Sequence, residues 1–536
     1  MSSAPSRNDL FLIGTGAEDQ TLNAEHAGSK AVNLWQMARL GLRLPPAFVV
    51  PAQLCNLINA QDSQAEAQLR RMLANGIGEL ENATGRIFGD ARRPLIVSVR
   101  SGAARSMPGM LDTILNTGMT PKTVHGLIRM TGNPRLAWDS YRRFVRSYAE
   151  VTGRTSGEAF EVKLTALMKS EGVASEAELD SEALERLTAS YLDEARAETG
   201  EPISGYPYHQ LETAAKAVFL SWDSERAREY RRLNGLEDLV GTAVTVQAMV
   251  FGNGGARSGA GVAFTRNPAT GAKELYLDFL FDAQGEDVVA GARVLSHPEL
   301  FEERLPEAAR DLKEGAFRLE SHFRDMQDIE FTVEDGALYF LQTRPAKRTP
   351  RAGLRVLFDM VREGMIDAGE GARRAADIDI DAAAITRFDG EAQAIASGTP
   401  ASAGVASGRA AFDSTRAAEL SRLSADPVIL IRPETSTADV AGFAVSGGIL
   451  TARGGRTAHA AVVARQLGRA CVVGCRELAV DEHARRALIS GHRLKEGDWV
   501  SIDGESGEIF LGQRRIVRAR PEEEIAEIKR WQKLQR

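Results

Sequence analysis

Cysteine is scarce in this chain of 536 residues. The three cysteines, Cys55, Cys471 and Cys475, are too few and too unevenly spaced to form a disulfide framework. The Cys-x-x-x-Cys pair also lacks a second pair of ligands at the spacing of a zinc site. These features exclude a disulfide scaffold and a cysteine zinc site, and we expect a protein of the reducing cytoplasm.

Long apolar runs and an excess of one charge are absent too. No apolar stretch approaches the ~20 residues that span a bilayer, and the opening "MSSAPSRNDLFLIG" lacks the basic-then-apolar pattern of a signal peptide. The 66 basic and 73 acidic residues leave a net charge of -7. Because this balance does not favour a nucleic acid or a membrane surface as a partner, we expect a soluble protein whose phosphate sites are local.

The composition that is present is that of a folded globular protein. Hydrophobic residues make up 43% of the chain and charged residues 26%, and the length favours two to four domains. Strand-like apolar runs alternate with helical patterns from "LFLIGTG" to "LYFLQTRP". This alternation predicts a multidomain α/β protein.

Changes of pattern along the chain predict four segments. We expect one large unit over residues 1–350, in which the charged, alanine-rich stretch at about 134–232 is a helical insertion. Residues 351–395 have helical periodicity and are expected to form a linker. Residues 396–513, with short β segments between glycine turns, are expected to form a smaller domain, and residues 514–536 a charged linker helix.

One histidine stands out in the smaller domain. In "GGRTAHAAVVARQLG", Thr457 is expected to cap a helix that starts near Ala458 and ends at Gly468, which places His459 in the first turn. The positive end of the helix dipole favours a neutral, nucleophilic imidazole, and the free N–H groups there stabilise an attached phosphoryl group. A phosphohistidine is one interpretation. A histidine that only satisfies its own hydrogen bonds beside a turn is the commoner alternative for a lone histidine.

Two further patterns suit a nucleotide. In "LIVSVRSGAARSMPGMLDTILN", a strand leads to Arg100 and a loop of small residues, where backbone N–H groups and a guanidinium can meet phosphate oxygens. In "MQDIEFTVEDGALYFLQTRP", Asp328 and Glu330 share one face of a strand, and the next strand brings Gln342 and Arg344. Paired carboxylates facing phosphates hold Mg²⁺. An arginine buried against a carboxylate and a structural acid pair are the alternatives.

The histidine segment resembles a known family. The stretch "RPETSTADVAGFAVSGGILTARGGRTAHAAVVARQLGRACVVGC" is similar to the phosphohistidine domain of the pyruvate phosphate dikinase family. The resemblance implies a swivelling β/α domain in which His459 carries a phosphoryl group between two distant sites. It implies that Thr457 corresponds to a regulatory phosphorylation site and that Arg453 helps to hold phosphate. Ala458 stands where the family usually has a serine.

The first 350 residues resemble the nucleotide part of the same family. The resemblance implies an ATP-grasp nucleotide-binding domain, in which Lys30 of "AGSKAVNL" matches a phosphate-contacting lysine and Ser29 replaces a glycine. The loop "MPGMLDTILN" favours inorganic phosphate as a second phosphoryl acceptor. The implied nucleotide-binding residues are Lys30, Arg100, Gln247, Val250, Glu286, Asp287, Asp328, Glu330, Gln342 and Arg344, with Asp328 and Glu330 as ligands of Mg²⁺.

The resemblance also implies an activity and partners. ATP and inorganic phosphate would give AMP and pyrophosphate while His459 becomes phosphorylated. The barrel with which the family binds pyruvate and phosphoenolpyruvate has no counterpart in these residues, so a separate subunit or domain is the expected partner; a homodimer is also considered. Two alternatives stay open: a dikinase for another small acceptor, and a non-catalytic regulatory protein that binds ATP.

Overall fold

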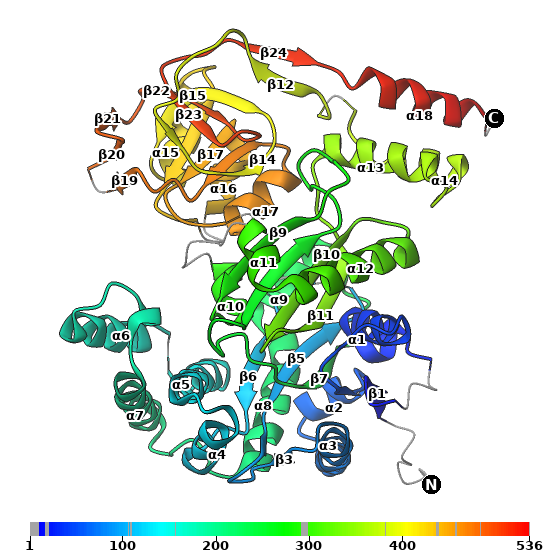
Figure 1. Cartoon of the computed structure of the whole chain (residues 1–536), viewed down its shortest axis with the longest axis vertical. Coiled ribbons are helices and arrows are strands. Elements are labelled where there is room, and N and C mark those ends of the chain that lie inside the picture. The colour runs from blue at the N-terminus through cyan, green and yellow to red at the C-terminus, as the bar shows by residue number, and fades with distance from the viewer. Residues whose placement is uncertain are drawn as a thin grey trace. The chain divides into compact units, whose positions relative to one another are not determined.

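The computed structural model describes residues 10–16, 21–105, 107, 110–155, 157–290, 298–380, 382–435, 439–455, 458–482 and 484–534. It has a mixed α/β architecture, as the sequence predicts (Figure 1). The chain forms two compact units. The first comprises Met1–Gly254 with Tyr339–Gln342, and the second Gly255–Leu338 with Thr343–Arg536. Among the described helices, none is both long and apolar enough to cross a membrane.

The first unit contains an antiparallel sheet of five strands in the order β1-β2-β7-β5-β6. All seven residues of β7, "TAVTVQA", are buried, as expected for a central strand rich in β-branched residues. The strands are β1 (Phe11–Ile13), β2 (Ala47–Val50), β5 (Val97–Ala103), β6 (Thr113–Thr117) and β7 (Thr242–Ala248), with a short pair β3 (Ile87–Phe88) and β4 (Pro94–Leu95).

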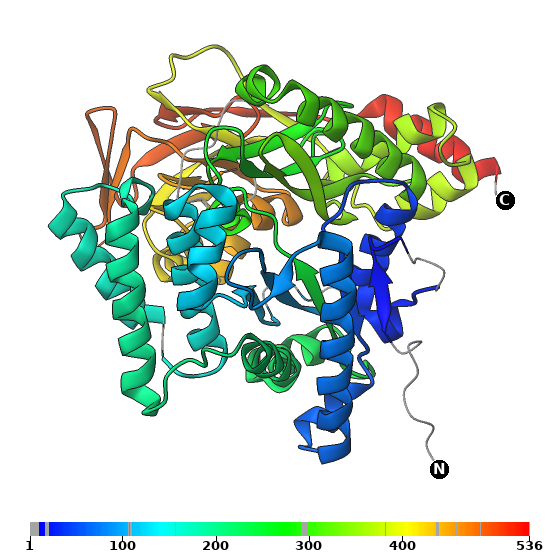
Figure 2. The ribbon, with the colours of Figure 1, turned by 60° about the horizontal axis from the view of Figure 1, so that its bottom comes forward.

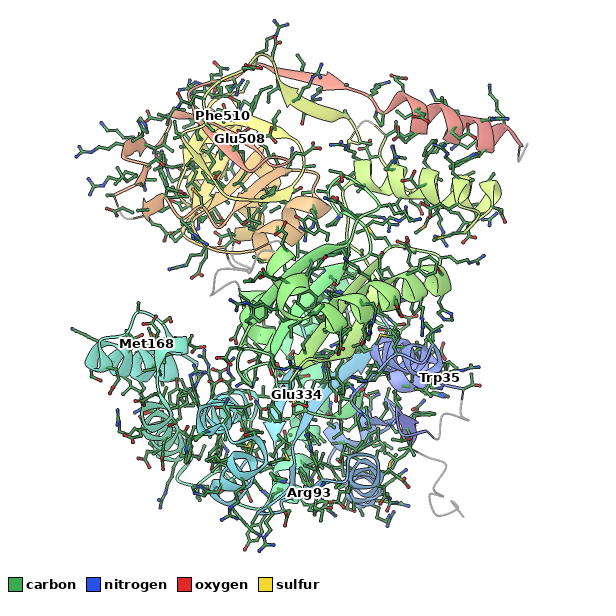
Figure 3. The ribbon with its side chains drawn as sticks, in the orientation of Figure 1. Trp35, Arg93, Met168, Glu334, Glu508 and Phe510 are labelled. Atoms are coloured by element: carbon green, nitrogen blue, oxygen red, sulfur yellow. The ribbon has the colours of Figure 1, made fainter. Side chains whose placement is uncertain are left out.

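Helices surround this sheet and fill the long connection from β6 to β7. Trp35 of α1 is nearly buried and lies under the guanidinium of Arg39, 4.9 Å from its ring centroid (Figure 3). The helices are α1 (Ala24–Arg39), α2 (Leu54–Asn59), α3 (Ser63–Thr84), α4 (Pro121–Thr131), α5 (Pro134–Val151), α6 (Gly157–Glu171), α7 (Ser181–Thr199), α8 (Pro207–Leu220) and α9 (Glu225–Leu233), with two 3-10 turns, η2 (Glu176–Glu178) and η3 (Ser221–Asp223).

A buried ion network fixes α5. The Asp139 carboxylate accepts hydrogen bonds from Arg142 at 2.7 Å and from Arg143 at 3.0 Å, and both arginines also pair with Glu176. Asp139 accepts a third bond, at 3.0 Å, from the Asn253 side chain in the glycine-rich loop after β7. The arginines of this helix therefore serve its own packing, and the network holds the loop where the first unit ends.

The second unit begins with a four-stranded sheet in the order β11-β10-β8-β9. Two of its strands carry aromatic rings on one face, where Phe279 of β9 and Phe331 of β10 pack with Phe301 of helix α11, and α12 packs against β10. The opposite face carries the acidic residues described below. The elements are β8 (Gly259–Phe264), β9 (Tyr276–Phe281), α10 (Gly285–Ala290), α11 (Pro298–Arg304), α12 (Pro306–Phe323), β10 (Gln327–Glu334) and β11 (Ala337–Pro345).

Residues 396–513 form an eight-stranded sheet in the order β13-β23-β22-β15-β16-β17-β18-β14. Its centre, β15 to β18, is parallel, with helices in the connections. The elements are β13 (Ala396–Ser397), β14 (Thr399–Ser402), β15 (Val405–Ala411), α15 (Ser414–Leu423), β16 (Val428–Arg432), α16 (Val440–Val445), β17 (Gly448–Thr451), α17 (His459–Gln466), β18 (Ala470–Val473), β22 (Trp499–Asp503) and β23 (Glu508–Leu511), and β19 (Leu478–Asp481), β20 (Arg486–Ile489) and β21 (His492–Lys495) form a small separate sheet.

The C-terminal helix α18 (Glu522–Leu534) packs against α13 (Pro350–Arg362) and α14 (Ala368–Ala375), which lie about 150 residues earlier in the chain (Figures 1 and 2). Ile525, Ile528 and Trp531 form the buried face of α18. Strand β24 (Ile516–Ala519) pairs with β12 (Ile385–Phe388). The segment before residues 396–513 and the segment after them thus contact each other, through the β12–β24 strand pair and through the packing of α18 on α13 and α14.

Candidate active site

His459 is the first residue of α17, at the carboxyl end of the parallel strands. This edge of an open α/β sheet is where ligands usually bind. The N-cap is Ala458, so the predicted cap by Thr457 is wrong: the extended backbone of Ala458 (φ -60, ψ 156) starts the helix one residue later. Thr457 itself lies outside the described residues. Gly468, with φ +62, follows the last turn as predicted.

No side chain among the described residues caps α17. Alanine at the N-cap has no side-chain acceptor for the N–H groups of the first turn, so Ala458 does not compete with an external anion for them. The backbone that carries His459 therefore offers hydrogen-bond donors and the positive end of a helix dipole to a phosphoryl group.

Arg453 lies in the loop between β17 and α17. Its guanidinium pairs with Glu434 of the loop after β16 at 3.2 Å, and both side chains are about 60% exposed. An exposed ion pair of this kind contributes little to stability, so Arg453 can exchange its partner for a phosphate.

A glycine turn positions Lys30 in the first unit. Gly28 interrupts α1 with φ +79, and a Cβ there would lie 2.1 Å from the Gly102 carbonyl oxygen in β5. Only glycine permits so close an approach. The Ser29 hydroxyl donates to the Ala103 carbonyl at 3.1 Å. The predicted lysine turn is thus held against the end of β5.

Strand β5 also carries Arg100, whose Nη2 donates to Gln342 Oε1 at 3.5 Å. The structure therefore brings together two of the predicted residues of this unit. Ser106, Pro108 and Gly109, from the loop after this strand, lie outside the described residues.

The base-binding candidates have a different setting. Gln247 is buried in β7, and its amide nitrogen donates to the Pro45 carbonyl at 3.1 Å, so this group already holds the neighbouring loop. The apolar pattern before Val250 predicts a strand that ends at this residue, but β7 ends at Ala248. The backbone N–H groups of Ala248 and Met249 bond to Pro46 and Ile96, where the chain leaves the sheet.

In the second unit, Asp328 and Glu330 lie on one face of β10, as their spacing predicts. Arg344 of β11 donates from Nε to Asp328 Oδ2 at 2.8 Å. Asp328 is only 5% exposed, and burial raises the pKa of its carboxyl above the ordinary value, against the opposing effect of Arg344.

The other oxygen of Asp328, Oδ1, is buried and makes no hydrogen bond within the described part of the chain. A buried acceptor without a donor is costly, and a cation would satisfy it. Within the same part of the chain, no cluster of three or more histidine, cysteine or acidic side chains could hold a metal by itself. Two carboxylates with further oxygens from phosphate and water are the donor set that Mg²⁺ takes in nucleotide sites, so these residues fit Mg²⁺.

Asp278 joins this acidic face but was not identified from the sequence. Asp278 lies in β9 opposite Val262 of β8, and Val262 lies opposite Glu330 of β10. The side chains of Asp278, Val262 and Glu330 therefore point to the same side of the sheet. Asp278 is 3% exposed. The available signal was an acid in the middle of the apolar strand "YLDFLF".

Glu286 and Asp287 both lie in the first turn of α10. The Asp287 carboxylate accepts the Gln284 N–H at 2.9 Å, which stabilises the start of the helix. Glu286 is exposed. The predicted residues divide between the two units. The first unit holds Lys30, Arg100, Gln247, Val250 and Gln342, and the second holds Glu286, Asp287, Asp328, Glu330, Arg344, Arg453 and His459.

Known proteins match both parts of the chain. The family model described as "Pyruvate phosphate dikinase, AMP/ATP-binding domain" matches residues 59–306 and 301–364. The model described as "PEP-utilising enzyme, mobile domain" matches residues 424–507, which include His459.

Curated relatives match along almost the whole chain. The pyruvate, phosphate dikinase of Clostridium symbiosum is 44% identical over 490 residues, which are 90% of this chain and 56% of the relative. The enzyme of Rhizobium meliloti (strain 1021) is 41% identical over 97% of this chain and 60% of its own length, and pyruvate, phosphate dikinase 2 of Zea mays is 41% identical over 96% and 59%. The chain thus spans just over half the length of these relatives.

Proposed function

Because the chain belongs to the pyruvate phosphate dikinase family, we propose that it transfers a phosphoryl group from ATP to His459. The observation that carries this proposal is the position of His459 at the start of α17, after an alanine N-cap and within the stretch that matches a mobile domain. The carboxylates of Asp328 and Glu330 on β10 support the same function.

The proposed reaction has two balanced steps. The imidazole of His459 attacks the β-phosphorus of ATP, the bond to the α-phosphate oxygen breaks, and AMP leaves. Inorganic phosphate then takes the terminal phosphoryl group from the pyrophosphoryl-histidine, which releases pyrophosphate and leaves phosphohistidine. The protein mainly contributes positioning and charge neutralisation.

The basic residues of the site are proposed to contact phosphate, and the acidic residues are proposed to bind the metal ion. Lys30, Arg100 and Arg344 contact phosphates, with Gln342 beside Arg100. Asp328 and Glu330 hold Mg²⁺, which neutralises phosphate charge when bound. Arg453 and the first turn of α17 receive the transferred group. The remaining candidates from the sequence are Gln247 and Val250 near the base, Glu286 and Asp287 near the ribose or metal, and Thr457 as a regulatory site.

We further propose the domain roles. Residues 1–350 form an ATP-grasp nucleotide-binding domain with a helical insertion at about 134–232, and residues 351–395 and 514–536 are linkers. Residues 396–513, here called the carrier domain, swivel with His459 between two sites. Pyruvate, which the names of the relatives contain, is proposed as the final acceptor at a separate domain or subunit.

Labelled ATP tests the reaction. With Mg²⁺ and phosphate, label from the β-position of ATP should stay on the protein as an acid-labile, base-stable adduct, whereas label from the γ-position should leave in pyrophosphate. His459→Ala should take up neither. Equal labelling of His459→Ala and the parent chain would show that the carrier is another residue.

A further inference from the structure

Arg465 is a buried cation on the helix that carries His459. It is 1% exposed, and its Nη1 donates to the Ala401 carbonyl of β14 at 2.8 Å. Its guanidinium lies over the ring of Phe264 in β8, 5.5 Å from the centroid. Its Nε has no hydrogen-bond partner within the described ranges. Arg465 thus contacts strand β14 of its own domain on one side and Phe264 of the β8–β11 sheet on the other.

The surface that Arg465 meets is the acidic face of that sheet. Phe264 lies opposite Asp328 in β10 and opposite Tyr276 in β9, so these three side chains share the face, and Asp278 lies two residues beyond Tyr276. Burial lowers the pKa of Arg465, while Tyr276, Cys471, Asp278 and Asp328 act in the opposite direction. The two carboxylates among these groups, Asp278 and Asp328, both belong to the sheet.

A second contact lies beside the first. The Tyr276 hydroxyl donates to the Pro400 carbonyl at 2.9 Å, next to the Ala401 carbonyl that accepts from Arg465. Two adjacent carbonyls of β14 therefore receive one hydrogen bond from the sheet and one from α17. At the rim, Arg351 of α13 pairs with Glu505 of the carrier domain at 2.8 Å.

A buried cation without an ion-pair partner is costly unless nearby charge compensates it. No ion pair of Arg465 within 4 Å occurs among the residues that the structure covers. In this arrangement Asp278 and Asp328 supply the compensation, and away from the sheet water would supply it. The stability of the contact between the carrier domain and the sheet therefore depends on the negative charge of the acidic face.

We propose that Arg465 is the positioning residue that docks the carrier domain on the acidic face of the β8–β11 sheet. Docking there brings the domain of His459 to the sheet that bears the proposed metal ligands Asp328 and Glu330. The effect on phosphorylation rests on the proposed function, but the docking itself does not.

Crosslinking measures docking without any chemistry at ATP. Ala272 and Glu505 line one cleft of about 890 Å³, together with residues of α13 and α18. The variant Ala272→Cys/Glu505→Cys is treated with a short bis-maleimide in the absence of nucleotide. The native thiols are buried, so the two new ones react.

In this background, Arg465→Gln should slow crosslinking at least tenfold, and Arg465→Lys should recover part of the rate because it keeps the charge. Arg469→Gln is the matched control, because Arg469 contacts Ala444 within the carrier domain and should leave the rate unchanged. An unchanged rate in Arg465→Gln would overturn the proposal.

A variant on the sheet side of the contact tests the proposal even if Arg465→Gln does not fold. Asp278→Asn should also slow crosslinking, and the double variant should be no slower than the slower single variant. Additive effects, or no effect of Asp278→Asn, would overturn the proposal.

Labelling of His459 separates this inference from the proposed function. Arg465→Gln should lower the labelling rate at saturating ATP while the ATP concentration for half-maximal rate stays the same. A parent chain that crosslinks as expected but never labels would refute the proposed function alone. Normal labelling of Arg465→Gln would refute the positioning role alone.

Discussion

The three cysteine side chains are buried, and burial suppresses their ionisation. It raises the pKa of Cys55 and Cys475 to about 11 and that of Cys471 to about 12. A neutral thiol packs as a small apolar group. The cysteines therefore act as core residues, and their stabilising effect is complete only while the pH stays below the pKa of thiols in the unfolded chain.

This behaviour predicts a loss of stability in base. The unfolded thiol ionises near pH 8.5, so the stabilising effect is complete below that pH and disappears as the pH rises toward the raised native values. Between pH 9 and 11, Cys471→Ala should lose less free energy of unfolding than the parent chain, by about 1.4 kcal/mol per pH unit. Denaturant titrations at several pH values measure this, and parallel curves would contradict it.

Arg344 and Glu330 provide a second prediction for single residues. Arg344→Ala removes the partner of Asp328, and Glu330→Gln removes a charge beside it, so each should slow labelling of His459 by about a hundredfold or more. Arg348→Ala is a matched control, because Arg348 pairs with Asp325 at the same distance of 2.8 Å but is not among the proposed site residues. Labelling near the parent rate in both site variants, with unchanged thermal unfolding, would place the nucleotide site elsewhere.

Helix α5 illustrates how one element depends on buried charge. Burial opposes ionisation of Asp139, but the guanidinium groups of Arg143 and Arg142 outweigh it and hold the pKa of the carboxyl well below its usual range. Through Asn253, the same carboxylate holds the loop that follows β7. The element thus connects the helices of the first unit to the point where the chain leaves that unit.

Asp139→Asn should destabilise the first unit by about 3–5 kcal/mol, because it removes the nearer of the two carboxylates that pair with Arg142, which is only 2% exposed. The lowered pKa adds a pH dependence. The stabilisation is complete above the unfolded value of about 3.9 and is lost as the pH falls toward the native value. Urea unfolding at pH 7 measures the change. The exposed Asp193→Asn on α7 should change stability by less than about 0.5 kcal/mol, and an equal effect of both variants would contradict the role of the network.

At the scale of the whole molecule, the main feature is the division into two units. The chain first passes from the first unit to the second at Gly254 and Gly255, and Tyr339–Gln342 belong to the first unit again. Each side of this passage is anchored within its own unit, by Asn253 to Asp139 and by the Gly255 N–H to Asp282 Oδ1 at 3.0 Å. Gly255 has φ +102, a conformation that favours glycine.

The proposed function predicts a single turnover for this chain. With ATP, Mg²⁺ and phosphate it should release one AMP per chain and stop, and pyruvate alone should not restart it. Adding the remaining part of a relative as a separate protein should give continuous turnover and phosphoenolpyruvate. The rate should be limited by encounter, because the lost tether would supply an effective concentration of about a millimolar. A time course of AMP measures this.

Each outcome of that time course has a different meaning. Steady turnover with pyruvate alone would reveal an acceptor site within this chain. The absence of any burst would favour a regulatory protein that binds ATP without chemistry.

The sequence by itself determined the mixed α/β class, the placement of His459 in a first helical turn and the shared face of Asp328 and Glu330. These features depend on local periodicity and on motifs of a few residues, which are readable without knowledge of distant neighbours. The family resemblance likewise depends on contiguous segments, and the matches over residues 59–364 and 424–507 confirm it.

Only the tertiary structure decided which distant residues meet. Asp278 joined the acidic face because β8 lies between β9 and β10, and strand order is not encoded in any one segment. Arg465, in a helix that looks like an ordinary amphipathic pattern, was buried by a sheet nearly 200 residues earlier in the chain. Helix α18 packed against α13 and α14 because its apolar face needs a long-range partner. Such contacts depend on pairing between remote segments, which periodicity and spacing do not specify.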